Sequence, residues 1–113
     1  MISTTTKRTA SLPLADFYDR VLQNDALASA YLQDALAAFN ETEEWPALQL
    51  VLQNLTRAKG ITTIAEQMGI SRQSLSNMLN GDSVPSATRF LKLLHALGYR
   101  LEVKAVGGEL SDD

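Results

Sequence analysis

Four polar side chains between positions 72 and 77 have the types and spacing that reading DNA bases requires. They are Arg72, Gln73, Ser76 and Asn77, and on a helix the residues four positions apart share one face. Arginine is suited to O6 and N7 of guanine, and glutamine or asparagine to N6 and N7 of adenine. We therefore predict these four as base-reading residues on a helix that contacts double-stranded DNA.

Residues on either side of this segment are suited to the phosphate backbone. Thr62 and Thr63 begin an expected helix, where free N–H groups and the helix dipole favour an anion. Basic side chains add long-range attraction, whereas the acidic Asp82 should keep its loop farther from the backbone. The predicted phosphate-binding residues are Thr62, Thr63, Ser71, Asn80, Gly81, Ser83, Arg57, Lys59 and Arg89.

Two short helices joined by a glycine turn are expected to position these side chains. Ile64 and Met68 lie four residues apart on one apolar face, and Leu75 continues that face beyond the turn. Gly69 stands where the chain must turn sharply, which favours a residue that tolerates positive φ. Ser71 can cap the second helix by accepting a bond from a first-turn N–H group.

The turn and cap residues of this segment agree with a known family. In order and spacing, residues 47–98 resemble the lambda-repressor-like (Xre-type) helix-turn-helix family. The resemblance implies an all-α fold with a five-helix DNA-binding domain, and we expect Gly81 to end the second helix in the left-handed conformation. The residues that carry the resemblance are Ala65, Gly69-Ile70-Ser71, Asn80-Gly81, Pro85-Ser86 and Ala96-Leu97-Gly98.

The rest of the chain is expected to be mainly helical up to Gly98. Pro13 suits the first turn of a helix that ends near Leu22, and Asn24 or Asp25 suits the cap of a longer helix. The acidic residues 40–44 predict a connection. The expected organisation is a flexible arm (1–11), an N-terminal helical extension (12–46), the helix-turn-helix domain (47–98), a C-terminal strand (99–106) and an acidic tail (107–113).

The strand is expected because residues 99–105 strictly alternate apolar and polar side chains. A lone strand has unpaired ladder groups that attract another chain. Its partner is left open: the same strand of a second copy, the N-terminal arm, or another protein. Because symmetric repressors read two half-sites about 34 Å apart, we expect a homodimer on a palindromic operator, formed through this strand or the last helix.

The N-terminal third carries a second, less specific resemblance. Residues 15–18 and 25–36, followed by the helix-turn-helix segment, look like the antidote of a two-gene addiction module. This resemblance implies that the chain neutralises a small, basic, RelE-like ribonuclease toxin and represses its own operon. Two alternatives stay open: a stand-alone repressor of host or phage origin, and a helical adaptor that has lost DNA binding.

The charge distribution fits a two-sided molecule. The net charge is −3 overall, made up of −4 over residues 1–46, +4 over 47–104 and −3 over 105–113. This asymmetry indicates one half that faces DNA and one that faces another partner, such as a basic protein. The absence of cysteine, signal peptide and apolar span predicts a cytoplasmic protein away from membranes.

Residues that could serve catalysis are few. His95 is the only histidine and lies in a leucine-rich helix, so we expect a partly buried structural residue. Glu41, Glu43 and Glu44 fall in a polar connection that cannot hold two carboxylates at a fixed separation. Trp45 is expected to be a packing anchor between the two halves. The sequence therefore predicts a protein that is not an enzyme and that needs no cofactor and no metal.

Overall fold

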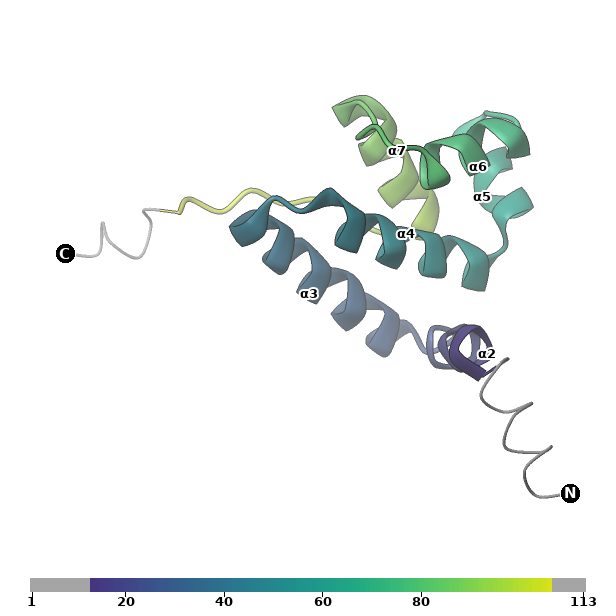
Figure 1. The fold of residues 1–113 in the computed structure, drawn as a ribbon, viewed down its shortest axis with the longest axis horizontal. Coiled ribbons are helices and arrows are strands. Elements are labelled where there is room, and N and C mark those ends of the chain that lie inside the picture. Colours follow the sequence, from purple (N-terminus) through teal and green to yellow (C-terminus); the bar gives the residue numbers. More distant parts are fainter. Residues whose placement is uncertain (1–12, 107–113) are drawn as a thin grey trace, which may run out of the picture.

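The computed structural model describes residues 13–106, which form six helices and no β-strand. The helices lie in two layers on either side of α4, with α2 and α3 on one side and α5, α6 and α7 on the other (Figure 1). None of these helices is long and apolar enough to cross a membrane. Their bounds are α2 (Pro13–Val21), α3 (Asp25–Thr42), α4 (Trp45–Lys59), α5 (Ile61–Met68), α6 (Arg72–Asn80) and α7 (Ala87–Leu97).

Helix α4 lies at the centre because its buried surface is wider than one apolar stripe. Leu48, Leu52 and Leu55 follow the i, i+4, i+7 spacing of one face and are each at most 1% exposed. Val51 and Trp45 are buried on the same face, and the polar Asn54 and Thr56 extend the buried surface around the helix. The two layers cover this surface from both sides.

The N-terminal layer begins with the expected helices and departs from the prediction at its end. Asn24 caps α3, since its Oδ1 accepts a 3.0 Å bond from the N–H of Leu27. The expected connection at residues 40–44 is shorter than predicted, because α3 continues to Thr42. Glu43 then ends the helix in the left-handed conformation (φ 58°) and donates its N–H to the Phe39 carbonyl.

The expected cap at Ser71 is confirmed, and the structure shows a second serine cap at Ser86. Ser71 Oγ accepts from the N–H of Ser74 at 3.0 Å, and Ser86 Oγ accepts from the N–H of Arg89 at 3.2 Å. The prediction that Gly81 adopts the left-handed conformation is wrong, because this residue is extended (φ −77°). A glycine is needed there for another reason: an added Cβ would lie 2.8 Å from the Asn77 carbonyl oxygen.

The expected strand at residues 99–106 is also wrong. Residues 101–105 have no regular structure, and the segment runs away from the helices (Figure 1). An alternating pattern yields a strand only when a ladder partner is present, and the described part of this chain offers none. The expected five-helix domain is corrected too, because α4 to α7 are followed by this extended segment rather than a fifth helix.

The two ends of the expected organisation fall outside the described residues. These are the predicted flexible arm (1–11) and the predicted acidic tail (107–113). The all-α class predicted for the chain fits residues 13–106.

Candidate nucleic-acid interface

Helix α6 presents Gln73 and Asn77, two of the four predicted base-reading residues, on the side opposite its core contacts. Leu75 is 0% and Leu79 is 6% exposed, which fixes the inward face. Around the rest of the helix, Arg72, Gln73 and Asn77 are exposed, and Ser76 is half-buried. The outer face of α6 therefore carries amide, hydroxyl and guanidinium groups and no acid.

Hydrogen bonds order part of this outer face in the free protein. Gln73 Nε2 donates to Asn77 Oδ1 at 3.0 Å, one turn along the helix. Asn80 Nδ2 donates to the Ser76 carbonyl at 2.9 Å and to Ser76 Oγ at 3.2 Å. Gln73 and Asn77 thus form an aligned amide pair, the arrangement that could address neighbouring base edges together.

The backbone at the start of α5 is suited to binding an anion. Thr62 and Thr63 are exposed in its first turn, beside the exposed Lys59. Gly60 precedes the helix with φ 102° and has no side chain to cap it. First-turn N–H groups without an intrahelical partner are the groups that bind phosphate at helix N-termini.

The loop after α6 brings several predicted residues together. Gly81, Ser83 and Arg89 line a shallow depression of about 360 Å³ together with Asn77 of the outer face. Asp82 lines it as well and adds a negative charge. The structure therefore places three predicted phosphate-binding residues next to a predicted base-reading residue.

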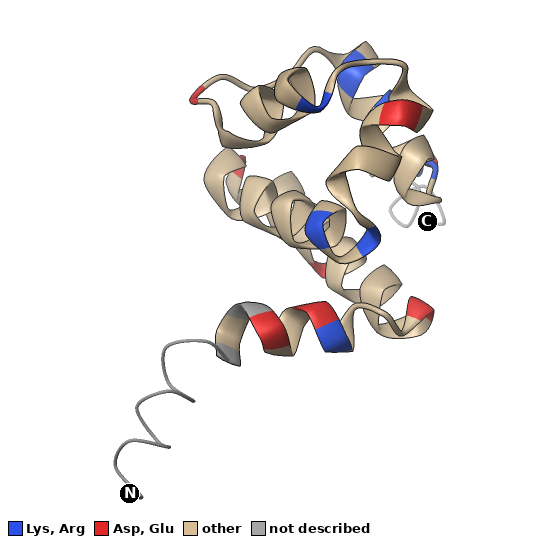
Figure 2. Cartoon of the chain, turned by 90° about the vertical axis from the view of Figure 1, so that its right-hand side faces the viewer, with Lys and Arg blue, Asp and Glu red and all other residues tan. Residues whose placement is uncertain are grey.

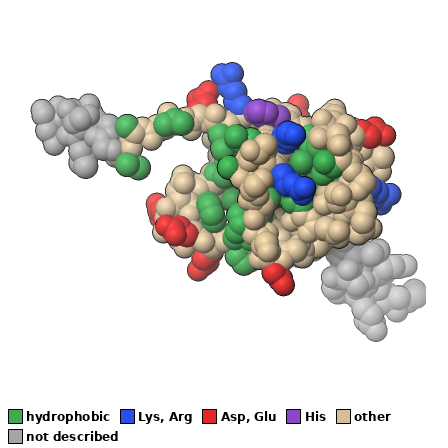
Figure 3. All heavy atoms as spheres, turned by 90° about the horizontal axis from the view of Figure 1, so that it is seen from above, with side chains coloured by type: hydrophobic (Ala, Val, Ile, Leu, Met, Phe, Trp, Pro, Cys, Tyr) green, Lys and Arg blue, Asp and Glu red, His purple; other side chains and the backbone are tan. Residues whose placement is uncertain are grey.

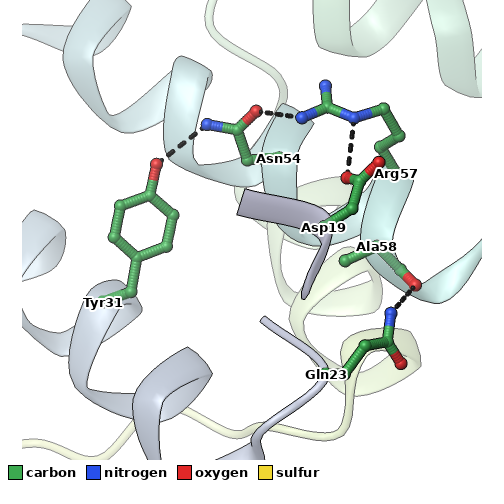
Figure 4. Close-up of polar contacts among 6 residues, drawn as sticks. All are labelled: Asp19, Gln23, Tyr31, Asn54, Arg57 and Ala58. Atoms are coloured by element: carbon green, nitrogen blue, oxygen red, sulfur yellow. Dashed lines mark hydrogen bonds and ion pairs between the residues drawn. The ribbon is translucent and has the colours of Figure 1, made fainter. Parts of the chain in front are cut away.

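Besides Asn80, the predicted phosphate-binding residues Ser71 and Arg57 use their side chains within the chain. Ser71 Oγ caps α6 and donates to Ser74 Oγ at 2.9 Å. Arg57 faces the N-terminal layer: its Nε donates to Asp19 Oδ1 at 3.0 Å and its terminal nitrogen donates to Asn54 Oδ1 at 2.8 Å (Figure 4). Arg57 also lines a depression with Asn80, so it lies between the two layers rather than on the outer face of α6.

Two glutamines that the sequence reasoning missed fix the end of α6. Gln49 Nε2 donates to the Gly81 carbonyl at 2.7 Å, and Gln53 Nε2 donates to the Leu79 carbonyl at 2.6 Å. Gln53 also donates to Asn80 Oδ1 at 3.1 Å. Side chains four residues apart share one face of a helix, so the Gln49–Gln53 spacing on α4 was the available indication.

Charges separate between the two layers. Acidic residues outnumber the single basic residue on α2, whereas most of the basic residues lie on α4 and the helices beyond it, together with a few acids (Figure 2). Viewed from the side of α5 to α7, basic side chains lie in the middle of the surface and at two of its edges, and acidic ones lie around the rim (Figure 3). This face therefore concentrates the positive charge that phosphate contact requires.

Two expectations for single residues have opposite outcomes. Trp45 is confirmed as a packing anchor, because it is 9% exposed and its ring lies 6.3 Å from that of Phe39 on α3 and 6.4 Å from that of Phe90 on α7. The prediction that His95 is partly buried is wrong, because this side chain is exposed on α7. Within residues 13–106, no group of three His, Cys, Asp or Glu side chains could hold a metal ion.

The comparisons with known proteins identify the class of the chain. Residues 14–105 match the model of a family described as "Probable addiction module antidote protein". The match spans both layers and most of the sequence, and the chain belongs to this family. Comparison with curated proteins and with solved structures finds no match.

Proposed function

We propose that this protein is an antidote that neutralises a small toxin and represses its own operon by binding a palindromic operator as a homodimer. It acts by binding and not as an enzyme. The observation that carries the proposal is the family match over residues 14–105. The polar outer face of α6 supports the DNA-binding part, because its side chains suit base edges.

The N-terminal layer supports a basic partner of the RelE-like type. Among residues 1–46, seven acidic side chains outnumber three basic ones. Asp16, Asp25 and Asp34 are exposed on α2 and α3. Complementary charge speeds and orients protein association, so a basic toxin suits this layer.

Growth of cells tests the antidote part directly. The small reading frame adjacent to this gene is expressed alone and then together with this protein. We expect growth arrest that this protein relieves, and co-purification of the two chains. Absence of both arrest and complex would refute the antidote role and leave a stand-alone repressor.

Binding to DNA selected from a random duplex library tests the second part. Gln73→Ala is expected to relax the preference at its base position, by about 1–3 kcal/mol of discrimination. Arg89→Ala is expected to weaken binding to all sequences alike and to reduce the salt slope by about one. The matched control is Arg20→Ala on α2, which should change neither quantity.

Each variant has an outcome that removes its residue from the proposed interface. Unchanged discrimination after Gln73→Ala would exclude Gln73 from base reading. An unchanged salt slope after Arg89→Ala would exclude Arg89 from phosphate contact. Failure to select any duplex with the unaltered protein would refute DNA binding altogether.

A further inference from the structure

An apolar groove of about 750 Å³ lies between the two layers, next to the α6–α7 loop. Its walls come from the second half of α3, the start of α4, the beginning of α7 and the extended segment 101–104. Hydrophobic side chains line the hollow between the lobes in Figure 3. The groove is thus a built feature of the fold, shared by elements far apart in sequence.

The floor of the groove is rigid and aromatic. Phe39, Trp45 and Phe90 line it and pack edge to face against one another. Leu48, 1% exposed, lies in the same lining. Large apolar side chains at the base of a concave surface are the usual anchor points of a protein interface.

The extended segment at the rim of the groove is apolar and solvent-exposed. Val103 is 99%, Val106 is 91% and Leu101 is 44% exposed. Val103 and Val106 are thus almost wholly open to solvent, and exposed apolar side chains that lie together mark interaction sites. The segment therefore has the chemistry of the occupant that the groove would take.

Charges on the segment and at the groove are complementary. Lys104 of the segment is exposed, as are Glu41, Glu43 and Glu44 at the α3–α4 turn. Arg100 pairs with Glu102 of the same segment at 3.3 Å, which leaves Lys104 as its unpaired cation among the described residues. That turn lies at the groove, because Asn40 and Trp45 on either side of it both line the walls. None of the ion pairs among residues 13–106 joins these basic residues to these acids.

We infer that the groove of one copy receives the extended segment 101–106 of a second copy, and that this reciprocal docking forms the homodimer. Leu101 and Val103 enter the apolar groove through their side chains, and Lys104 faces the glutamates of the α3–α4 turn. A two-fold pair uses the same groove and the same segment twice. The inference rests on the proposed homodimer and names its interface.

The place of the groove agrees with DNA binding by a pair of copies. Its wall includes Val84 and Pro85, which directly follow the predicted phosphate-binding residue Ser83. A second copy seated there lies beside the loop proposed to contact the backbone. Two such copies would present two sets of base-reading residues, as a palindrome requires.

Cysteine trapping tests the contact, because the chain contains no natural cysteine. A Val103→Cys protein is mixed with an affinity-tagged Ala37→Cys protein, since Ala37 is exposed and lines the groove on α3. We expect a covalent heterodimer under mild oxidation. The matched control is Ala26→Cys, an exposed alanine of α3 outside the groove lining, which should give far less product.

Sedimentation of the free protein, without DNA or toxin, tests the energetics. Val103→Glu should weaken self-association at least tenfold with the helix content unchanged, because this side chain is 99% exposed. Lys104→Glu alone and Glu41→Lys with Glu44→Lys should each weaken it. A protein that carries Lys104→Glu, Glu41→Lys and Glu44→Lys together should regain self-association, because its segment again meets a groove of opposite charge.

Each contrary result overturns the inference without deciding the proposed function. A Val103→Glu protein that dimerises normally, or trapping only between two Val103→Cys chains, would exclude docking in the groove. A Val103→Glu protein that stays dimeric but no longer relieves growth arrest would assign the groove to the toxin instead. Conversely, a protein that shows the trapped dimer but relieves no arrest would refute the antidote role and keep the interface.

Discussion

The two layers packed on α4 differ in how much apolar surface they bury. The N-terminal layer contributes three buried apolar side chains, Leu22, Ala28 and Leu32, whereas helices α5 to α7 contribute eight. Polar contacts make up part of the difference: Tyr31 OH accepts from Asn54 Nδ2, Arg57 pairs with Asp19, and Gln23 donates to the Ala58 carbonyl (Figure 4).

This difference indicates how the stability of the molecule is divided. Burial of apolar surface is the main favourable contribution to folding, so helices α5 to α7 should form the more stable unit with α4. A layer with few buried contacts opens at a lower free energy than the rest of the fold. We therefore expect amide hydrogens of α2 and α3 to exchange faster than those of α5 and α6.

The largest expected effect comes from removing a core side chain of the well-packed layer. Leu94 of α7 is 0% exposed. Leu94→Ala should lower the free energy of unfolding by about 2–5 kcal/mol, because it removes buried contacts and leaves a cavity. Chemical denaturation measures this, and the exposed Leu91→Ala of the same helix is the control. If Leu94→Ala lowered the free energy of unfolding less than Leu91→Ala does, the expected division of stability between the two layers would be contradicted.

The next effect tests the polar contacts of the N-terminal layer. Asn54 is 6% exposed and joins Tyr31 OH to Arg57. Asn54→Ala should cost about 1–3 kcal/mol, because it leaves both partners without their hydrogen bonds. Hydrogen exchange should show the loss concentrated in α2 and α3.

A matched substitution at the exposed end of the same network should cost less. The Arg57–Asp19 pair is about two-fifths exposed on both sides, so Asp19→Asn should cost about 0–1 kcal/mol. If Asn54→Ala and Asp19→Asn lowered the free energy of unfolding equally, burial would not determine how much each polar contact stabilises this layer.

A smaller effect is expected where α4 holds the end of α6. Gln53→Ala removes the part-buried bond to the Leu79 carbonyl and the bond to Asn80, which should cost about 0.5–1.5 kcal/mol. Affinity for the selected duplex should fall further than stability alone explains, since the loop after α6 is no longer fixed. Gln67→Ala, at an exposed glutamine of α5, should leave stability unchanged.

The smallest effect concerns pH. Burial, and to a lesser degree the Asp25 carboxylate, raise the pKa of Tyr99 above its ordinary value of 10.0. The folded chain therefore keeps this proton at pH values where the unfolded chain has lost it. The free energy of unfolding should be unaffected below about pH 10 and should fall as the pH rises through the raised pKa.

Tyrosinate absorbance measures this shift, and Tyr99→Phe identifies the transition that belongs to Tyr99. Asp25→Asn should lower the pKa of Tyr99 only partly, because burial is the larger cause. A return to the ordinary value after Asp25→Asn would instead make the carboxylate the main cause.

The sequence predicted those features that depend on neighbouring residues. The helices, the serine cap at Ser71 and the inward Leu75 all follow from local spacing. Asn77, predicted to read bases, and Ser83 and Arg89, predicted to bind phosphate, line the same depression in the structure. Which of them contact DNA stays a prediction.

The errors arose where the outcome depends on distant partners. The alternating residues 99–105 form no strand because a ladder requires a second segment. Gly81 is a local exception, because it is needed for the approach of the Asn77 carbonyl four positions earlier rather than for a left-handed turn. Arg57 faces Asp19, which lies 38 positions earlier in the sequence, and no local pattern could have indicated that.

The position of Trp45 gives the protein a natural optical reporter. It is the only tryptophan of the chain, so the whole indole emission arises at the aromatic floor of the groove. Seating of a second chain there would change the polarity around this ring and its access to a soluble quencher. Dilution of the unlabelled protein could then be followed by fluorescence, and assembly would be measured without any substitution.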